Sequence, residues 1–241
     1  TGLYIHIPFC HKICSYCDFV KRVSTIDTID KYIDTLIKEI ELYQEKGFDF
    51  STVETIYVGG GTPSILSCKN FKKLLDKLFE IIQKNKIQEF TVEFNPEDLN
   101  NELIDLLVSY NVNRISIGIQ TFNEKLLKVL NRSFDIDLFL KRFEYLKTKI
   151  NNINIDLMYA IPNQTIEDLE DTILKVIELN PTHLSLYSLI LNSIFLMLPI
   201  CKAKCKDSES RAQKKQVYSI FYIETLPIFV VTTKIVQIKI K

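Results

Sequence analysis

The sequence lacks the features that mark several classes of protein. No apolar run is long enough to cross a bilayer, so we expect no transmembrane segment. The 30 basic residues are balanced by 30 acidic ones. The net charge therefore gives no electrostatic reason to expect nucleic acid or a membrane surface as a partner.

The start of the chain, Thr1-Gly2-Leu3-Tyr4, shows no basic region followed by an apolar one, so we expect no signal peptide. We predict a cytoplasmic location. The sequence also begins without an initiator Met. We therefore expect the natural chain to start further upstream, which leaves an organellar location open.

Cysteine is not abundant enough for a disulfide scaffold, because there are six in 241 residues. Three of them, Cys10, Cys14 and Cys17, nevertheless lie within eight residues of one another. Such clustering without an export signal indicates a reducing compartment and metal ligation.

Short apolar runs alternate with longer amphipathic ones along most of the chain. Strands are predicted over residues 3–7, 55–58, 89–94, 114–117, 153–157 and 183–189. Helices are predicted over residues 28–46, 68–83, 101–110, 123–130, 135–149 and 165–179, with Ser67 as an N-cap. This alternation predicts an α/β fold with parallel strands and right-handed crossovers. Periodicity alone leaves open whether the sheet forms a barrel or a doubly wound layer. Either places a site at the carboxyl ends of the strands.

The pattern changes near residue 192. From Ser193 onward there are nine Lys and Arg residues against three Asp and Glu residues, and the last residues alternate apolar and polar. We predict a core over residues 1–191 and a divergent or truncated C-terminal segment over residues 192–241. Cys201 and Cys205 lie in this basic segment, and we interpret them as an incidental pair and not as a second metal site.

The cysteine triad has the spacing Cys10-x3-Cys14-x2-Cys17 and directly follows the first predicted strand. Iron–sulfur clusters and zinc sites usually take four protein ligands, and zinc sites arrange them as two separated pairs. Only three thiols are close together here. A cubic iron–sulfur cluster with one iron left open accounts for that number, and the open iron could bind a substrate or cofactor. A zinc site with a nitrogen from His6 or His11 is the alternative, as are three incidental cysteines.

Other motifs end the following strands. Three glycines precede Thr62 in "GGGTP", and glycine lets a backbone approach a ligand closely, although this is neither a Rossmann fingerprint nor a P-loop. Glu93 ends the third strand among apolar neighbours, where a carboxylate is costly unless it is paired. Each could equally be an ordinary turn or a solvent-facing charge.

The stretch "LYIHIPFCHKICSYCDF" resembles the radical S-adenosylmethionine (SAM) superfamily. It looks like the branch of the anaerobic coproporphyrinogen III oxidases and their HemW-like heme-chaperone relatives. The resemblance covers roughly residues 3–191 and implies a partial (β/α)6 TIM-like radical SAM barrel, here with an atypical C-terminal tail. It also implies a [4Fe–4S] cluster on Cys10, Cys14 and Cys17. The fourth iron of such a cluster chelates SAM, and one electron cleaves SAM to methionine and a 5′-deoxyadenosyl radical.

The resemblance further implies a set of residues around SAM. The "GGGTP" segment, with Gly60, Gly61 and Thr62, corresponds to contacts with the amino end of SAM, and Glu93 to a contact with the methionyl amine. Tyr4 and His6 match positions near the cluster and the adenosyl group, although His6 could equally be a satisfied core histidine.

Three further positions come from later motifs. Gln120, in "GIQ", corresponds to a contact with the ribose or carboxylate of SAM. Arg132, in "LNR", resembles the arginine that pairs with the SAM carboxylate, and Asp156, in "DLMYAIPNQ", suits the ribose diol.

Phe19 favours one of the two activities of the branch. The oxidases usually carry a further cysteine at this position, whereas "CDF" is typical of the heme chaperones. We therefore predict a HemW-like protein that binds heme and delivers it to an acceptor protein. The alternative is an oxidase that decarboxylates a porphyrinogen. An electron donor such as flavodoxin or ferredoxin is implied. The C-terminal "HNxxYW" segment of the relatives is missing, and the sequence contains no Trp.

Overall fold

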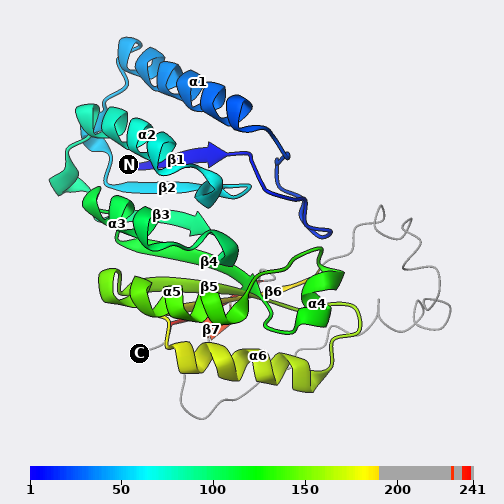
Figure 1. Cartoon of the computed structure of the whole chain (residues 1–241). Helices are drawn as coiled ribbons and strands as arrows, with labels where there is room; N and C mark the ends of the chain where they lie inside the picture. The colour runs from blue at the N-terminus through cyan, green and yellow to red at the C-terminus, as the bar shows by residue number, and fades with distance from the viewer. Residues whose placement is uncertain (190–228, 231–234, 240–241) are drawn as a thin grey trace.

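The computed structural model describes residues 1–189 and the backbone of residues 229–230 and 235–239 (Figure 1). The six predicted strands are all present: β1 (Gly2–Ile7), β2 (Thr55–Gly60), β3 (Glu89–Phe94), β4 (Arg114–Gln120), β5 (Asn152–Tyr159) and β6 (His183–Ser188). So are the six helices: α1 (Ile26–Glu45), α2 (Cys68–Ile81), α3 (Asn101–Ser109), α4 (Glu124–Val129), α5 (Ile136–Lys149) and α6 (Ile166–Leu179). The main difference from the prediction is at strand ends, where β2, β4 and β5 run further toward the site.

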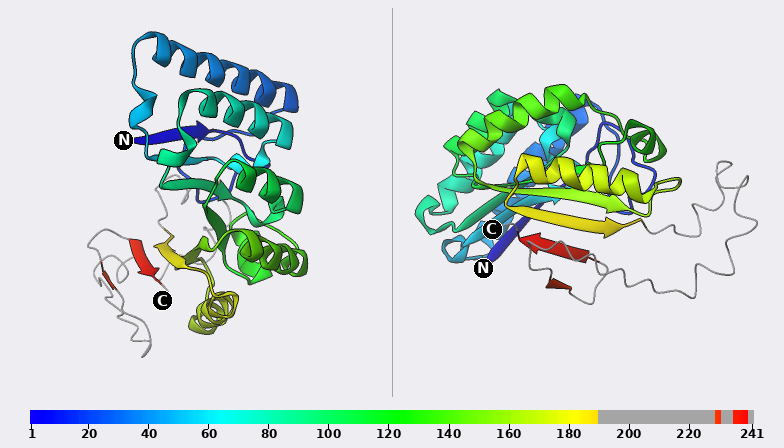
Figure 2. Two further views of the ribbon diagram at one scale, coloured as in Figure 1. Left: turned by 90° about the vertical axis from the view of Figure 1, so that its left-hand side faces the viewer. Right: turned by 90° about the horizontal axis from the view of Figure 1, so that it is seen from below.

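The strand order resolves the alternative that periodicity left open. The order β1-β2-β3-β4-β5-β6 follows the chain, and each of these pairs is parallel. A doubly wound sheet reverses its order midway and carries helices on both faces. Here every crossover moves one strand in the same direction, so the helices cover one face of a curved sheet (Figure 2). The result is a partial barrel.

The sheet is open, as the prediction of a partial barrel requires. Among the described residues β1 forms one edge. Beyond β6 the short strand β8 (Ile235–Lys239) pairs antiparallel, followed by β7 (Phe229–Val230). The rest of the predicted C-terminal segment, with Cys201 and Cys205, lies outside the described residues.

Local capping explains where several helices begin and end. Ser67 caps α2 as predicted, because its Oγ accepts a hydrogen bond from the Asn70 N–H at 3.2 Å. Thr165 and Asp168 form a reciprocal capping box at the start of α6. That helix ends at Asn180, which has a φ of 50° and precedes a proline.

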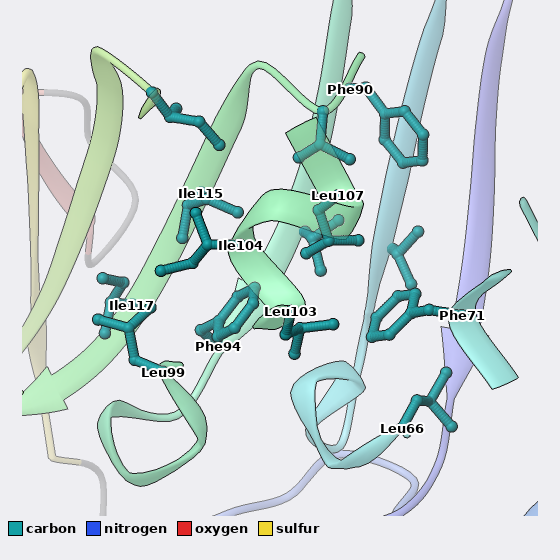
Figure 3. Packing of buried hydrophobic residues seen from close by; sticks show 14 of the residues in the cluster. Leu66, Phe71, Phe90, Phe94, Leu99, Leu103, Ile104, Leu107, Ile115 and Ile117 are labelled. Atoms are coloured by element: carbon teal, nitrogen blue, oxygen red, sulfur yellow. The ribbon is translucent and has the colours of Figure 1, made fainter. Parts of the chain in front are cut away.

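The core lies between the helices and the sheet. Alternate strand residues point toward the helices and are buried, such as Phe90 and Phe94 of β3 and Ile115 and Ile117 of β4. Figure 3 shows them packed beside Leu107 and other residues of α3. At about 25 cal/mol per Å² of apolar surface, burial of this layer is the main stabilising contribution to the fold.

The opposite face of the sheet carries polar side chains, which could bind a ligand. The side chains on this face come from four neighbouring strands: Glu93 of β3, Ser116 of β4, Asn154 and Asp156 of β5, and Ser185 of β6. The four residues of β4, β5 and β6 form hydrogen bonds to one another, and Glu93 accepts hydrogen bonds from β2, as expected of buried polar groups. A barrel with a structural interior would carry branched apolar side chains at these positions.

Candidate functional site

The cysteine loop connects β1 to α1 and has a firmly held base. Cys10 is buried, whereas Cys14 and Cys17 are half-buried. The Cys10 N–H donates to the Arg22 carbonyl at 3.1 Å. Thr62, just beyond β2, donates its N–H to the Phe9 carbonyl at 2.8 Å and its hydroxyl to the Cys10 Sγ at 3.4 Å. The first cysteine is thus tied to the glycine segment.

The three cysteines lie close enough together for the charge of one thiolate to raise the pKa of another. Burial raises the pKa of Cys10, and the charges of Cys17 and Cys14 raise that pKa further, while the Thr62 hydroxyl and Lys21 lower it. Burial also raises the pKa of Cys14, with Arg132 acting in the opposite direction. A metal ion would favour the thiolates, because ligating thiols are deprotonated.

No three Cys, His, Asp or Glu side chains of the described region form the ligand shell of one ion. Thiolates that hold a cubic cluster each bind a different iron, so they need not converge on one point. The donor set therefore fits such a cluster.

Neither histidine near the triad joins the three thiols. The Nε2 of His6 donates to the Val20 carbonyl at 3.0 Å, and its Nδ1 lies 2.9 Å from the Tyr4 hydroxyl. Both ring nitrogens of His6 are therefore engaged. The Nε2 of His11 lies 2.7 Å from Asp98 Oδ1. Of the two interpretations of His6, the satisfied histidine fits its contacts, and it ties β1 to the end of the cysteine loop.

The glycines of "GGGTP" provide space for this chain's own neighbouring strand and loop. A Cβ on Gly60 would lie 2.6 Å from His6 Nδ1, and Gly60 has a φ of 126° that favours glycine. A Cβ on Gly61 would lie 2.9 Å from Cys10 Sγ. The segment is therefore pressed against β1 and the cysteine loop, which leaves its backbone at the edge of the thiol site.

Glu93 is brought to the end of the glycine segment by the pairing of β2 with β3. Its Oε1 accepts the Tyr57 hydroxyl at 2.5 Å, and its Oε2 accepts the Gly60 N–H at 3.1 Å. Burial raises the pKa of Glu93; these two hydrogen bonds oppose the rise, and the charge of Asp156 adds to it. Tyr4 lies beside the same group, since Glu93 contributes to its raised pKa after burial. Such a carboxylate can receive an ammonium group.

Arg132 is buried, with 5% of its surface exposed, and reaches two different loops. One guanidinium nitrogen donates to Asn95 Oδ1 at 2.9 Å and another to the Tyr16 hydroxyl at 3.3 Å. Burial opposes the charge on Arg132, but Tyr16, Cys14 and Glu97 raise its pKa. Glu97 Oε2 lies 3.8 Å from the guanidinium and has no hydrogen-bond partner. The Arg132 guanidinium is therefore a positive charge held in one position next to Cys14.

Gln120 ends β4 in a conformation that is costly for this residue type. Its φ is 70°, and the register with β5 shifts between Gly118 and Gln120. A Cβ on Gly118 would lie 2.9 Å from the Gln120 Nε2 and 3.5 Å from Arg132. The amide therefore lies over the bare Gly118 backbone, beside Arg132. Strained backbone of this kind is concentrated at functional sites.

Asp156 lies on the polar face of β5 and is held by a network. Its carboxylate accepts the Asn154 amide at 2.8 Å and the Ser116 hydroxyl at 3.2 Å. The Asn154 Oδ1 in turn accepts the Ser185 hydroxyl at 3.0 Å. Burial raises the pKa of Asp156, and these hydrogen bonds oppose the rise.

The structure brings the sequence-predicted residues together at one end of the sheet. It also adds residues that the sequence analysis missed: Asn95, Tyr57 and Tyr16, which connect Thr62, Glu93 and Arg132 to their neighbours. Asn95 directly follows β3 in "EFNP", and this place just after a strand end could have identified it as a site residue. Tyr16 had none, since its partner is 116 residues away.

Comparison with known proteins defines the class. The Radical SAM superfamily matches residues 4–176, which is most of the chain. The chain belongs to this superfamily, whose members hold a [4Fe–4S] cluster and SAM.

Two kinds of relative are similar in sequence. The heme chaperone HemW of Lactococcus lactis is 44% identical over 192 residues, which cover 79% of this chain and 49% of the relative. The oxygen-independent coproporphyrinogen III oxidase of Escherichia coli is 34% identical over 189 residues, which cover 78% of this chain and 41% of the relative. The chain thus spans about half the length of these relatives or less.

The solved structures agree with the fold. The coproporphyrinogen III oxidase HemN of Escherichia coli superposes with a TM-score of 0.74 at 33% identity, covering 80% of this chain and 45% of that chain. SuiB of Streptococcus suis bound to SAM gives 0.53 at 17% identity, covering 80% and 40%, and supports the fold alone. No helix of the described region is long and apolar enough to cross a membrane.

Proposed function

We propose that this chain is the SAM-binding core of a HemW-like heme chaperone. The observation that carries the proposal is Phe19, at the position where the oxidases of the branch usually carry a further cysteine. Its side chain, which lies within the cysteine loop, is 72% exposed. The identity to HemW of Lactococcus lactis, which exceeds that to the Escherichia coli oxidase, supports it. On this view heme is the cargo, an acceptor protein is the partner and the cytoplasm is the location.

Cys10, Cys14 and Cys17 would hold three irons of a [4Fe–4S] cluster and leave the fourth for SAM. When bound and reduced, the cluster supplies an electron to SAM, delivered by a donor such as flavodoxin or ferredoxin. The chain's own residues bind and orient SAM. Arg132 offers a buried cation for its carboxylate, and Glu93 offers a carboxylate for its ammonium group.

The remaining predicted contacts complete the SAM site. Asp156, fixed by Asn154 and Ser116, would accept the ribose hydroxyls. Gln120 presents an amide beside Arg132, and Tyr4, which is 56% exposed, offers a ring to the adenosyl group. Gly60, Gly61 and Thr62 would line the amino end. Residues 192–241 are proposed as a separate C-terminal segment.

The test is anaerobic reconstitution of the full chain with iron and sulfide, followed by two assays on one sample. The chaperone proposal predicts that heme stays bound through gel filtration and that coproporphyrinogen III is not consumed with SAM and a reductant. Loss of heme from a sample with an intact cluster would contradict it. Formation of protoporphyrinogen would instead establish the oxidase, the alternative that similarity to the Escherichia coli HemN structure supports. Zinc without sulfide would indicate a zinc module.

A further inference from the structure

The tip of the cysteine loop, residues 12–16, is held by the turn that follows α4. We call residues 129–133 the α4 turn. Five hydrogen bonds join the two segments, which are more than a hundred residues apart in sequence. They are Asn131 Nδ2 to the Ile13 carbonyl at 2.7 Å, Lys12 Nζ to Ser133 Oγ at 2.9 Å, Ser15 Oγ to the Val129 carbonyl at 3.0 Å, Ser15 N–H to the Leu130 carbonyl at 3.2 Å, and Arg132 to the Tyr16 hydroxyl at 3.3 Å.

The α4 turn has a defined backbone shape of its own. The Asn131 N–H donates to the Lys128 carbonyl at 3.1 Å, and the Arg132 N–H donates to the Leu127 carbonyl at 2.8 Å. These two bonds form a Schellman motif, whose central residue is left-handed and is most often Gly, sometimes Asn. Asn131 occupies that position with a φ of 56°. An asparagine there keeps a side-chain donor that glycine would lack.

The α4 turn is also held by apolar packing against β5 and the residues that follow it. Leu126 and Leu130 form a small apolar cluster with Met158 and Ile161, and Tyr16 of the cysteine loop packs against it. Leu130 is 1% exposed. The turn therefore has a fixed position relative to β5, and the loop tip takes its position from the turn.

We propose that the α4 turn is a latch, meaning that its hydrogen bonds hold the loop tip around Cys14 in place. Asn131 is its positioning residue. Asn131 binds the carbonyl of Ile13, the residue directly before Cys14. Cys10 is held separately, by Thr62 and Arg22. Loss of the Asn131 side chain therefore loosens the loop next to Cys14, where the other four hydrogen bonds remain, and leaves Cys10 in place.

The latch also connects the cysteine loop to the residue assigned to the SAM carboxylate, although the two are more than a hundred residues apart in sequence. Arg132 belongs to the same turn as Asn131, so one five-residue segment positions both a cysteine ligand and the cation assigned to the SAM carboxylate. The inference rests on the proposed role of the cysteines, but its test is made on protein without a cluster.

The test compares Asn131→Gly with Asn111→Gly. Both replace a left-handed asparagine, since Asn111 has a φ of 63° at the end of α3, and glycine suits both backbones. Only the first removes a donor to the cysteine loop. Full-length protein free of metal is alkylated with iodoacetamide under reducing conditions, and the rate at each cysteine is read by mass spectrometry. We expect Cys14 to react about fivefold faster in Asn131→Gly, as the loss of one hydrogen bond predicts.

The internal controls are Cys10 and Cys68, which should react at the rate of the parent protein. Faster hydrogen exchange at the Ser15 amide, which donates to Leu130, would support the latch independently. A Cys14 rate equal to that of Asn111→Gly overturns the inference. So does an equal rise at Cys10, Cys14 and Cys68, because that would report general unfolding. Failure of the parent protein to form any cluster would defeat the proposed function without changing this result.

Discussion

The Tyr57 hydroxyl controls the charge of Glu93, and its removal gives the sharpest prediction about the SAM site. The hydroxyl donates to Glu93 Oε1 at 2.5 Å. Burial and the charge of Glu93 raise the pKa of Tyr57 so far that it remains a donor throughout the accessible range. A hydrogen bond to a charged group contributes about 1.5 to 3 kcal/mol, and Tyr57→Phe removes it.

The sign follows from the protonation of Glu93. Its pKa is already raised by burial, and the loss of a donor to the ionised form raises that pKa further. An ammonium group needs the ionised carboxylate, so SAM affinity falls as pH drops through this pKa. In Tyr57→Phe the fall begins at a higher pH, and between the pKa values of the parent and the variant the affinity for SAM should be lower in the variant by up to about tenfold to a hundredfold.

Two measurements check this prediction. The first is the pH titration of the 13C-labelled Glu93 carboxyl by NMR in cluster-free protein, assigned by its loss in Glu93→Gln. The second is equilibrium dialysis of SAM against reconstituted protein across pH. Tyr110→Phe is the matched control, since it removes a hydroxyl donor to Asp76 on the outer surface. The reasoning is refuted if Glu93 titrates at the same or a lower pH in Tyr57→Phe than in the parent protein.

Three further predictions concern the neighbours of the loop and the polar network. Leu130→Ala should lower the free energy of unfolding by about 2 to 5 kcal/mol in urea titrations, because it leaves a cavity beneath the α4 turn; an unchanged midpoint would contradict the packing. Arg132→Lys keeps the charge but cannot reach both Asn95 and Tyr16, so SAM affinity should fall about tenfold or more while iron and sulfide contents stay normal. Asp156→Asn should raise stability at pH 7.5 but not near pH 4: the folded pKa of Asp156 is raised by burial, so its destabilising charge is present only above that pKa. An equal gain in the free energy of unfolding at both pH values would contradict the raised pKa of Asp156.

The sequence predicted the elements well because each one carries its own signal. Alternation and apolar periodicity identified the strands and helices, and Ser67 identified a helix start. The curvature of the sheet is different. Whether β1 meets β6 depends on strand order and tilt, and periodicity describes one element at a time. The strand order excluded the doubly wound alternative only once pairing was known.

The site was predictable where its residues follow strand ends and not where they join loops. Glu93 and Asp156 were singled out by the resemblance to the radical SAM superfamily and by their place near the ends of predicted parallel strands, and their contacts with SAM stay predictions. Asn131 was recognised only as part of "LNR", although an asparagine just after a helix often adopts a left-handed conformation. Its contact with Ile13, 118 residues earlier, depends on tertiary packing that no local pattern encodes.

The central claim is that three cysteines hold a cluster whose fourth iron is reserved for SAM. The most direct test is electron paramagnetic resonance of the reconstituted, dithionite-reduced protein before and after SAM is added. The account predicts a [4Fe–4S]⁺ signal whose g values change with SAM and which is lost in Cys14→Ser. A signal unchanged at SAM concentrations that saturate binding by dialysis, or retained in Cys14→Ser, would contradict it.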